Sequence, residues 1–401
     1  MKDFSFWIIS ILGSLASIIS LIWGIGKYLH NRRLKYQNPF DNLSKIREKE
    51  IRRIVGQIRS GQSSAIIGVF EQEKTAILAA LNDQEYSDKA DRLIFSDLDI
   101  SSLDVDCDPE KFWKQALKPL KVNIEKQRQD DFWLRRLRWL LRRNVSPQVA
   151  KAYKECQNNQ FEEFYLKELF KQLKKDNRQL VLMIDRFDLL LQRKNLKRTH
   201  FLGNLREIAS CYPSSLNLVI TLSMLLQQFH QKNKELNPGG SPYFNFIDAN
   251  QVSLAVLSEA EIDKLLQQSE RKLTNEACDF IKNAAGGHPY LLRVATNVWW
   301  NAYDDDNKKN KVKNATKEFS NRISNLLDEI LQYCSKNTCK AFLSLMQKRE
   351  ISGFVNELKE LTKQGLIIEN NGVWQIHPSI FSSLLAEKAM QKLRESINGG
   401  M

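Results

Sequence analysis

The stretch GVFEQEKT, residues 68–75, constrains the fold of this chain more than any other part of the sequence. It continues an apolar run, SSAIIGVF, that predicts a short buried strand, and it leads into KTAILAALN, which predicts the start of a helix. A phosphate-binding loop has the pattern G-x-x-x-x-G-K-[ST] between a strand and a helix. Gly68, Lys74 and Thr75 fit that pattern, and Glu73 stands where the second glycine belongs.

In such a loop, backbone N–H groups and a helix N-terminus bind the anion, the lysine reaches the outer phosphates, and the hydroxyl binds Mg²⁺. The sequence therefore predicts Gly68, Lys74 and Thr75 as nucleotide-binding residues. Glu73 opposes binding, because two like unit charges about 4 Å apart repel by about 4 kcal/mol at an effective dielectric constant near 20. We expect this carboxylate to face the phosphates and to weaken their binding.

A second apolar run, LVLMID, ends at Asp185. A strand that ends in an aspartate holds Mg²⁺ in these nucleotide sites. Thr75 and Asp185 are thus the predicted metal ligands, and Asp185 and Asp188 are the candidate catalytic residues. Asp188 has a second interpretation, as the cap of the next helix, and Arg186 stands where a water-orienting glutamate often follows. The departures at Glu73 and Arg186 predict weak or absent ATP hydrolysis.

Further strands are predicted at 92–100, 179–191 and 216–224. They alternate with helical segments, including a helical insertion at about 110–178. This alternation predicts an α/β fold with a parallel sheet that has helices on both faces. After about residue 255 the chain is predicted to be helical, apart from a hairpin in GLIIENNGVWQIH that turns at Asn371-Gly372.

The N-terminus carries a candidate membrane anchor. Residues 4–26 contain no formal charge over 23 positions, which is enough helix to span roughly 30 Å of hydrocarbon. Lys27, Arg32, Arg33 and Lys35 follow, so the positive-inside rule predicts a single-pass protein of the inner (plasma) membrane with its bulk in the cytoplasm. A cleaved signal peptide is the competing interpretation; it would be shorter, begin more basic and end in small residues.

The order of these motifs resembles the STAND group of AAA+ P-loop NTPases (signal-transduction ATPases with numerous domains). The resemblance is to the bacterial, often cyanobacterial, AAA-like domain proteins, whose pattern opens with N-P-F, G-R-E-x-E-I and G-P-x-x-x-G-K-T-S. It covers about residues 38–390, and GGHPYLL is its most specific part. The matching stretches are Asn38-Pro39-Phe40, residues 46–51, GVFEQEKTA, SPYFNF (241–246), LSEAEIDKLL (257–266), GGHPYLLRVA (286–295) and QGLIIENNGVWQIHPSIFSSLL (364–385).

The resemblance implies a switch that binds ATP or ADP with Mg²⁺, in which a helical lid and a winged helix close over the nucleotide. Thr221 or Ser223 would sense the γ-phosphate, and Pro289 would lie near the base. His377 resembles a winged-helix histidine that contacts the β-phosphate, and a surface or core position is its other interpretation. The implied domains are an anchor and basic segment (1–36), a P-loop NTPase-like core (37–255), a helical lid (256–325) and a winged-helix domain (326–401).

The chain departs from the family pattern within this one site. The departures are Ile46 for the first glycine, Glu73 for the second, Ala76 for the serine, Arg186 for the glutamate, and Met224 where an arginine often sits. Together they predict relaxed or abandoned catalysis.

The net charge suggests further partners. A net charge of +13 suits nucleic acid or anionic lipid, or is an uninformative basic surface. The segment DDFWLRRLRWLLRRN (130–144) would bind lipid headgroups or nucleic acid, or pack on the sheet. Its arginines are Arg135, Arg136, Arg138, Arg142 and Arg143. The six cysteines form no C-x-x-C pair and predict reduced residues rather than a disulfide scaffold.

Three functions remain open on the sequence alone. The first is a membrane-anchored signalling or defence switch that changes its assembly, as a homo-oligomer or with a protein partner, in response to nucleotide. The second is a catalytically dead P-loop scaffold that binds a protein or nucleic acid. The third is a DNA-associated AAA+ ATPase, which a winged helix and basic charge would suit.

Overall fold

The computed structural model describes residues 38–82, 92–129, 145–236, 245–269, 271–303, 311–370, 372–382, 384–385 and 388–391 of the 401-residue chain. The predicted anchor, the arginine-rich segment 130–144 and Asn371 lie outside these residues. No helix within the described ranges combines the length and the apolar character needed to cross a bilayer.

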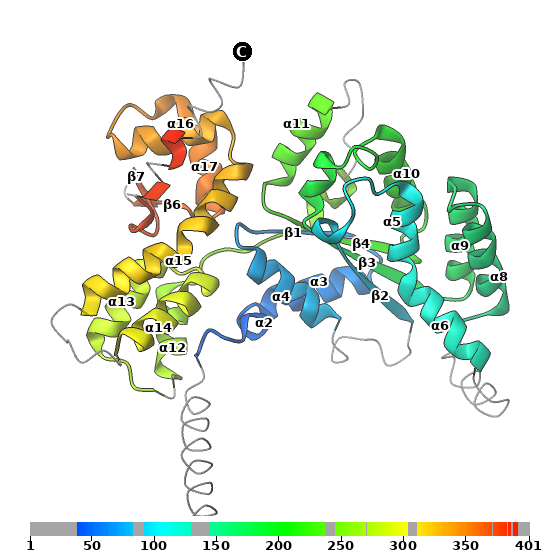
Figure 1. The fold of residues 1–401 in the computed structure, drawn as a ribbon, viewed down its shortest axis with the longest axis horizontal. Coiled ribbons are helices and arrows are strands. Elements are labelled where there is room, and N and C mark those ends of the chain that lie inside the picture. The colour runs from blue at the N-terminus through cyan, green and yellow to red at the C-terminus, as the bar shows by residue number, and fades with distance from the viewer. Residues whose placement is uncertain are drawn as a thin grey trace, which may run out of the picture.

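A five-stranded parallel sheet organises the first part of the chain (Figure 1). Its strands are β1 (Ser64–Ile67), β2 (Leu93–Asp99), β3 (Gln179–Asp185), β4 (Leu216–Leu222) and β5 (Gln251–Ser253). Their order in the sheet is β2-β3-β4-β1-β5, so β3 and β4 lie between the consecutive strands β1 and β2. Because all pairs are parallel, the carboxyl ends of β1, β3 and β4 meet at one edge, where open α/β sheets bind ligands.

The predicted strands are confirmed, except for the second half of 179–191. There the chain leaves the sheet at Arg186, whose φ of 54° is left-handed, and forms a 3₁₀ helix, η2 (Phe187–Gln192). A left-handed residue cannot continue an extended strand, so the apolar run after Asp185 packs as a helix instead.

Alternating side chains of the strands build two separate cores. Leu180, Leu182 and Ile184 of β3 pack in one core, and Val181 and Met183 pack in the other. The first core also receives α5 (Pro109–Ala116), α6 (Lys118–Gln129), α8 (Pro147–Asn158), α9 (Glu163–Lys175), α10 (Thr199–Cys211) and α11 (Leu226–Leu236). The second receives α3 (Glu48–Arg59) and α4 (Glu71–Leu81). The predicted layers, with helices on both faces, are therefore present.

The rest of the chain forms a helical unit beside the sheet (Figure 1). Its elements are α12 (Glu259–Gln267), α13 (Asn275–Ala285), α14 (Pro289–Tyr303), α15 (Lys311–Tyr333), α16 (Lys336–Met346), η5 (Ser352–Phe354), α17 (Val355–Lys363) and the hairpin β6 (Ile367–Asn370) and β7 (Val373–Ile376). We call residues 257–391 the helical unit and residues 48–254 the sheet unit. One continuous hydrophobic core runs through the helical unit, and it includes Phe40 and Phe70 from outside it.

Candidate functional site

The segment that matches the phosphate loop is shorter in the structure than its sequence pattern suggests. β1 ends at Ile67 and α4 already begins at Glu71, so only Gly68, Val69 and Phe70 lie between them. Glu71 and Glu73 stand in the first turn of α4, where negative charge is favourable at a helix N-terminus. The Glu73 N–H donates to the Phe70 carbonyl. The backbone that would wrap around a phosphate is therefore wound into a helix.

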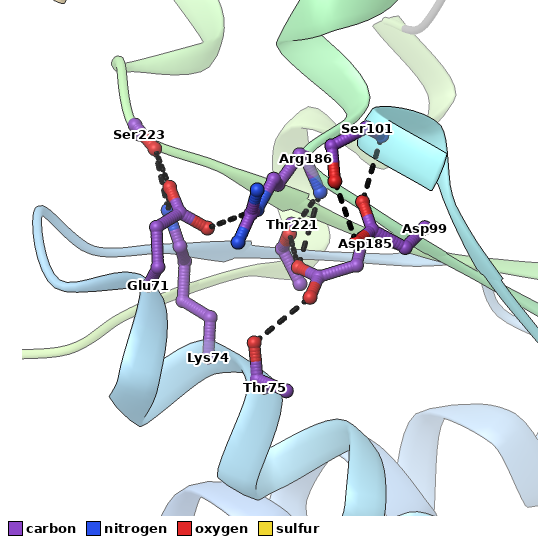
Figure 2. A network of polar contacts seen from close by, with 9 residues as sticks. All are labelled: Glu71, Lys74, Thr75, Asp99, Ser101, Asp185, Arg186, Thr221 and Ser223. Carbon is purple, nitrogen blue, oxygen red and sulfur yellow. Dashed lines mark hydrogen bonds and ion pairs between the residues drawn. The ribbon is translucent and has the colours of Figure 1, made fainter. Parts of the chain in front are cut away.

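Lys74 is engaged by the protein itself. Its side chain is 0% exposed, and Nζ donates to Glu71 Oε1 at 2.9 Å and to Ser223 Oγ at 2.6 Å. The Ser223 hydroxyl in turn donates to the same Glu71 oxygen. Figure 2 shows Glu71 lying between Lys74, Ser223 and Arg186. A buried ammonium is costly without an opposite charge beside it, and the Glu71 carboxylate supplies that charge.

The two predicted metal ligands lie together at the edge of the sheet. Thr75 Oγ1 donates to Asp185 Oδ2 at 2.9 Å, and Thr221 Oγ1 donates to Asp185 Oδ1 at 2.5 Å (Figure 2). Asp185 is buried at the end of β3, and Thr221 is buried in β4. The structure thus brings Lys74, Thr75, Asp185 and the two candidate sensor residues, Thr221 at the end of β4 and Ser223 just after it, into one network.

Arg186 occupies the position after Asp185 and contributes a cation rather than a carboxylate. Its backbone N–H donates to Thr221 Oγ1 at 2.8 Å and to Asp185 Oδ1 at 3.0 Å, which holds the left-handed residue in place. Its guanidinium Nε lies 3.5 Å from Glu71 Oε2. Glu71 therefore faces positive charge from both Lys74 and Arg186. Position 186 therefore lacks the carboxylate that orients the attacking water in many such sites.

The expected direction of Glu73 is wrong. The side chain turns away from Lys74, is buried, and accepts hydrogen bonds on Oε2 from Arg47 Nε and a second guanidinium nitrogen, at 3.1 and 2.6 Å. Its other oxygen, Oε1, accepts from the backbone N–H of Tyr290 at 3.1 Å. Repulsion of phosphates by Glu73 was the reason to expect weakened binding, and the carboxylate that faces Lys74 is Glu71 instead. Sequence spacing could not reveal the pairing with Arg47, 26 residues earlier.

The remaining predicted residues lie around this network or apart from it. Gly68 directly follows β1 and lies next to Leu254, where an added Cβ would approach the Leu254 side chain to 3.0 Å. Asp188 is buried in η2, and Pro289 begins α14. His377 is half-buried, with Nε2 2.7 Å from the Gly286 carbonyl oxygen in the α13–α14 turn. We therefore find His377 bridging parts of the helical unit.

A buried histidine that the sequence analysis did not single out makes a similar contact. His288 Nε2 lies 3.0 Å from the Gly365 carbonyl oxygen, and the ring packs edge-on against Phe70 with centroids 4.7 Å apart. Burial lowers the pKa of His288 from 6.5 to about 3, and it also lowers the pKa of His377. Both imidazoles are therefore neutral in the folded protein and can donate to these carbonyls.

This gives an expected pH dependence. The unfolded chain protonates His288 near pH 6.5, whereas the folded chain resists protonation down to about pH 3. The contribution of His288 to the free energy of unfolding is therefore full above about pH 6.5. It falls as the pH drops below that value, by up to about 1.4 kcal/mol per pH unit. Urea unfolding measures this effect. Between pH 7.5 and pH 5.0, the free energy of unfolding should fall less in His288→Asn than in the native chain. Equal losses in the two proteins would contradict this assignment.

The residues that would hold an Mg²⁺-nucleotide bind other side chains in this arrangement. Lys74 binds Glu71 and Ser223, the Thr75 and Thr221 hydroxyls bind Asp185, and α4 begins at Glu71, so residues 71–73 of the pattern are helical. Within the described part of the chain, no group of three or more His, Cys, Asp or Glu side chains is arranged to hold a metal ion. A polar cavity of about 1090 Å³ does adjoin the network, with Glu71, Gln72, Thr75, Arg186 and Arg293 in its lining.

Comparison with known proteins supports the fold. No protein-family model matches the sequence, and no curated protein matches it. Among solved structures, a Walker-type ATPase of Pyrococcus abyssi is similar, with 14% sequence identity and a TM-score of 0.53. The match covers 84% of this chain and 95% of that one. This similarity and the parallel sheet together indicate that the chain has the fold of a P-loop NTPase.

Proposed function

We propose that this chain is a P-loop NTPase-fold protein that does not hydrolyse ATP and acts as a scaffold for a protein partner. The observation that carries this proposal is the position of Glu71. Its carboxylate provides Lys74 with the negative charge that a phosphate provides in an active site. The scaffold was one of the three functions open on the sequence, and the engaged site favours it.

Electrostatics supports the same conclusion. A phosphate that approached Lys74 would have to displace Glu71 from both Lys74 and Ser223, or else lie beside its carboxylate. Like charges about 4 Å apart repel by about 4 kcal/mol at an effective dielectric constant near 20. That energy corresponds to roughly a thousandfold loss of affinity, since 1.4 kcal/mol is a factor of ten. Hydrolysis would also lack a carboxylate at position 186.

A switch is the second candidate, and the cavity beside Thr75 and Arg186 favours it. If a partner moved Glu71 out of the network, the lysine would face this space and the site would accept a phosphate. The signalling or defence role, the STAND-type classification, the winged helix at 326–401 and the assembly at the membrane would belong to this function. They rest on the sequence motifs and on the apolar segment 4–26.

The DNA-associated ATPase is the least favoured function. Helix α17 and the hairpin β6–β7 are the parts that a winged helix would present to DNA. Glu360 of α17 already contacts the sheet unit, because Gln228 Nε2 of α11 donates to its Oε2 at 2.7 Å. Steeply salt-dependent DNA binding by the full chain would return this function to consideration.

Nucleotide binding tests the proposal. The full chain, purified in detergent, should release no nucleotide on denaturation and should hydrolyse ATP no faster than Lys74→Met. Glu71→Gln removes the carboxylate that faces Lys74, so we expect its affinity for Mg²⁺-ATP, measured by calorimetry, to exceed that of the native chain at least tenfold. Micromolar ATP binding by the native chain that is lost in Lys74→Met would overturn the scaffold and support the switch.

A further inference from the structure

We infer that Glu73 is the centre of an internal clasp that holds the helical unit on the sheet unit. The clasp consists of Arg47, Phe70, Glu73, His288 and Tyr290, and it uses a different carboxylate from the one that faces Lys74. The inference therefore does not depend on the proposed function. It assigns a role to Glu73 that a phosphate-loop residue does not have.

The polar half of the clasp joins three segments of the chain. Glu73 projects from the first turn of α4, Arg47 lies between α2 (Leu43–Ile46) and α3, and Tyr290 stands in the first turn of α14. The Glu73 carboxylate accepts three hydrogen bonds from the other two residues, at 2.6 to 3.1 Å. Arg47 adds a fourth connection by donating to the Ala255 carbonyl at 2.8 Å. The side chains of Arg47 and Glu73 are 3% and 2% exposed.

The hydrogen bond from Tyr290 to Glu73 lies at the N-terminus of α14, where a carboxylate is favourable. Pro289 is the first residue of the helix and has no N–H, so Tyr290 offers the first backbone donor of α14. A carboxylate at a helix N-terminus also interacts favourably with the positive end of the helix dipole. Glu73 thus satisfies a helix end of the helical unit from within the sheet unit.

The apolar half of the clasp is Phe70, which lies at the N-cap position of α4. Its ring is 2% exposed and packs with the core of the helical unit rather than with either core of the sheet. It meets His288 at a centroid distance of 4.7 Å and Tyr290 at 5.9 Å. Phe70 and Glu73 are three positions apart, close to one turn of helix, so α4 presents both to the start of α14.

The glycine of the phosphate-loop pattern could not do this, because it has no side chain to reach Arg47 or Tyr290. With Glu73 in its place, the joint between the units is supplied by the chain itself and requires no ligand. The structure therefore gives the departure from the loop pattern a positive role: position 73 couples the units.

Hydrogen exchange of the full chain in detergent, followed by mass spectrometry, tests the clasp. Glu73→Gln keeps the size of the side chain and removes its charge. We expect exchange in residues 286–296 and 38–47 to accelerate at least tenfold, with β3 and β4 unchanged. Glu73→Asp, which keeps the charge but shortens the reach, should give an intermediate acceleration at the same sites and serves if Glu73→Gln fails to fold.

Glu71→Gln is the matched control, since it removes a carboxylate two positions away that contacts no part of the helical unit among the hydrogen bonds and ion pairs described. It should leave exchange in residues 286–296 at the native rate. The inference is overturned if the Glu73 variants leave α14 unchanged, if they accelerate all segments including β3 and β4 equally, or if Glu71→Gln has the same effect on α14. None of these outcomes depends on whether ATP binds.

Discussion

Replacing Arg47 with methionine is expected to lower the free energy of unfolding by about 3–5 kcal/mol, because it leaves the Glu73 carboxylate buried without its cation. The two guanidinium contacts to Glu73 Oε2 and the contact to the Ala255 carbonyl are lost together. Methionine retains much of the apolar volume, so a cavity accounts for little of the loss. Urea unfolding followed by circular dichroism measures the change.

An exposed ion pair in the same region provides the control. Arg52 and Glu48 form an i,i+4 pair on α3 with 69% and 47% of their side chains exposed. Arg52→Met should lower stability by less than about 1 kcal/mol, as surface pairs do. The double variant Arg47→Met/Glu73→Gln should be more stable than the two single losses predict, because it leaves no unpaired charge. Strict additivity of the two changes would argue against a direct pairing.

Phe70→Ala is expected to lower stability by about 3–5 kcal/mol, the range for truncating a buried phenylalanine. The ring reaches from the segment between β1 and α4 into the core of the helical unit, so its loss leaves a cavity between the units. We expect limited proteolysis to cut between residues 254 and 289 more readily in this variant. The same unfolding experiment gives the energy.

Phe164 supplies the comparison for this second prediction. It is 73% exposed on α9, and Phe164→Ala should change stability by no more than about 0.5 kcal/mol. A similar small effect at Phe70 would show that the packing of its ring against His288 and Tyr290 contributes little.

Much of the fold followed from local pattern. The apolar runs at 63–70, 92–100 and 216–224 predict strands, because β-branched and aliphatic residues between helical segments favour buried parallel strands, and β1, β2 and β4 lie within them. β3 ends earlier than the predicted strand 179–191, since the apolar residues after Asp185 suit a strand and a buried 3₁₀ helix equally well. The left-handed conformation of Arg186, which decides between them, depends on the hydroxyl of Thr221 in the next strand.

The candidate site was predicted in part for the same reason. Parallel strands place their carboxyl ends at one edge, so Lys74 and Asp185 are expected to converge there, and they lie in one network with Thr75 and Thr221. Their partners were not predictable. Glu71 occupies a variable position of the loop pattern, to which the pattern assigns no role. Only the early start of α4 turns its side chain toward Lys74.

The sequence alone determined the order of the strands and helices along the chain and the residue types at the sheet edge. These follow from periodicity and from contacts close in sequence, which a single chain displays directly. The tertiary structure decided which of two neighbouring carboxylates faces Lys74 and which one joins the units. Residues 71 and 73 differ by about 200° around a helix, so their surroundings are set by the elements that pack on either side of α4.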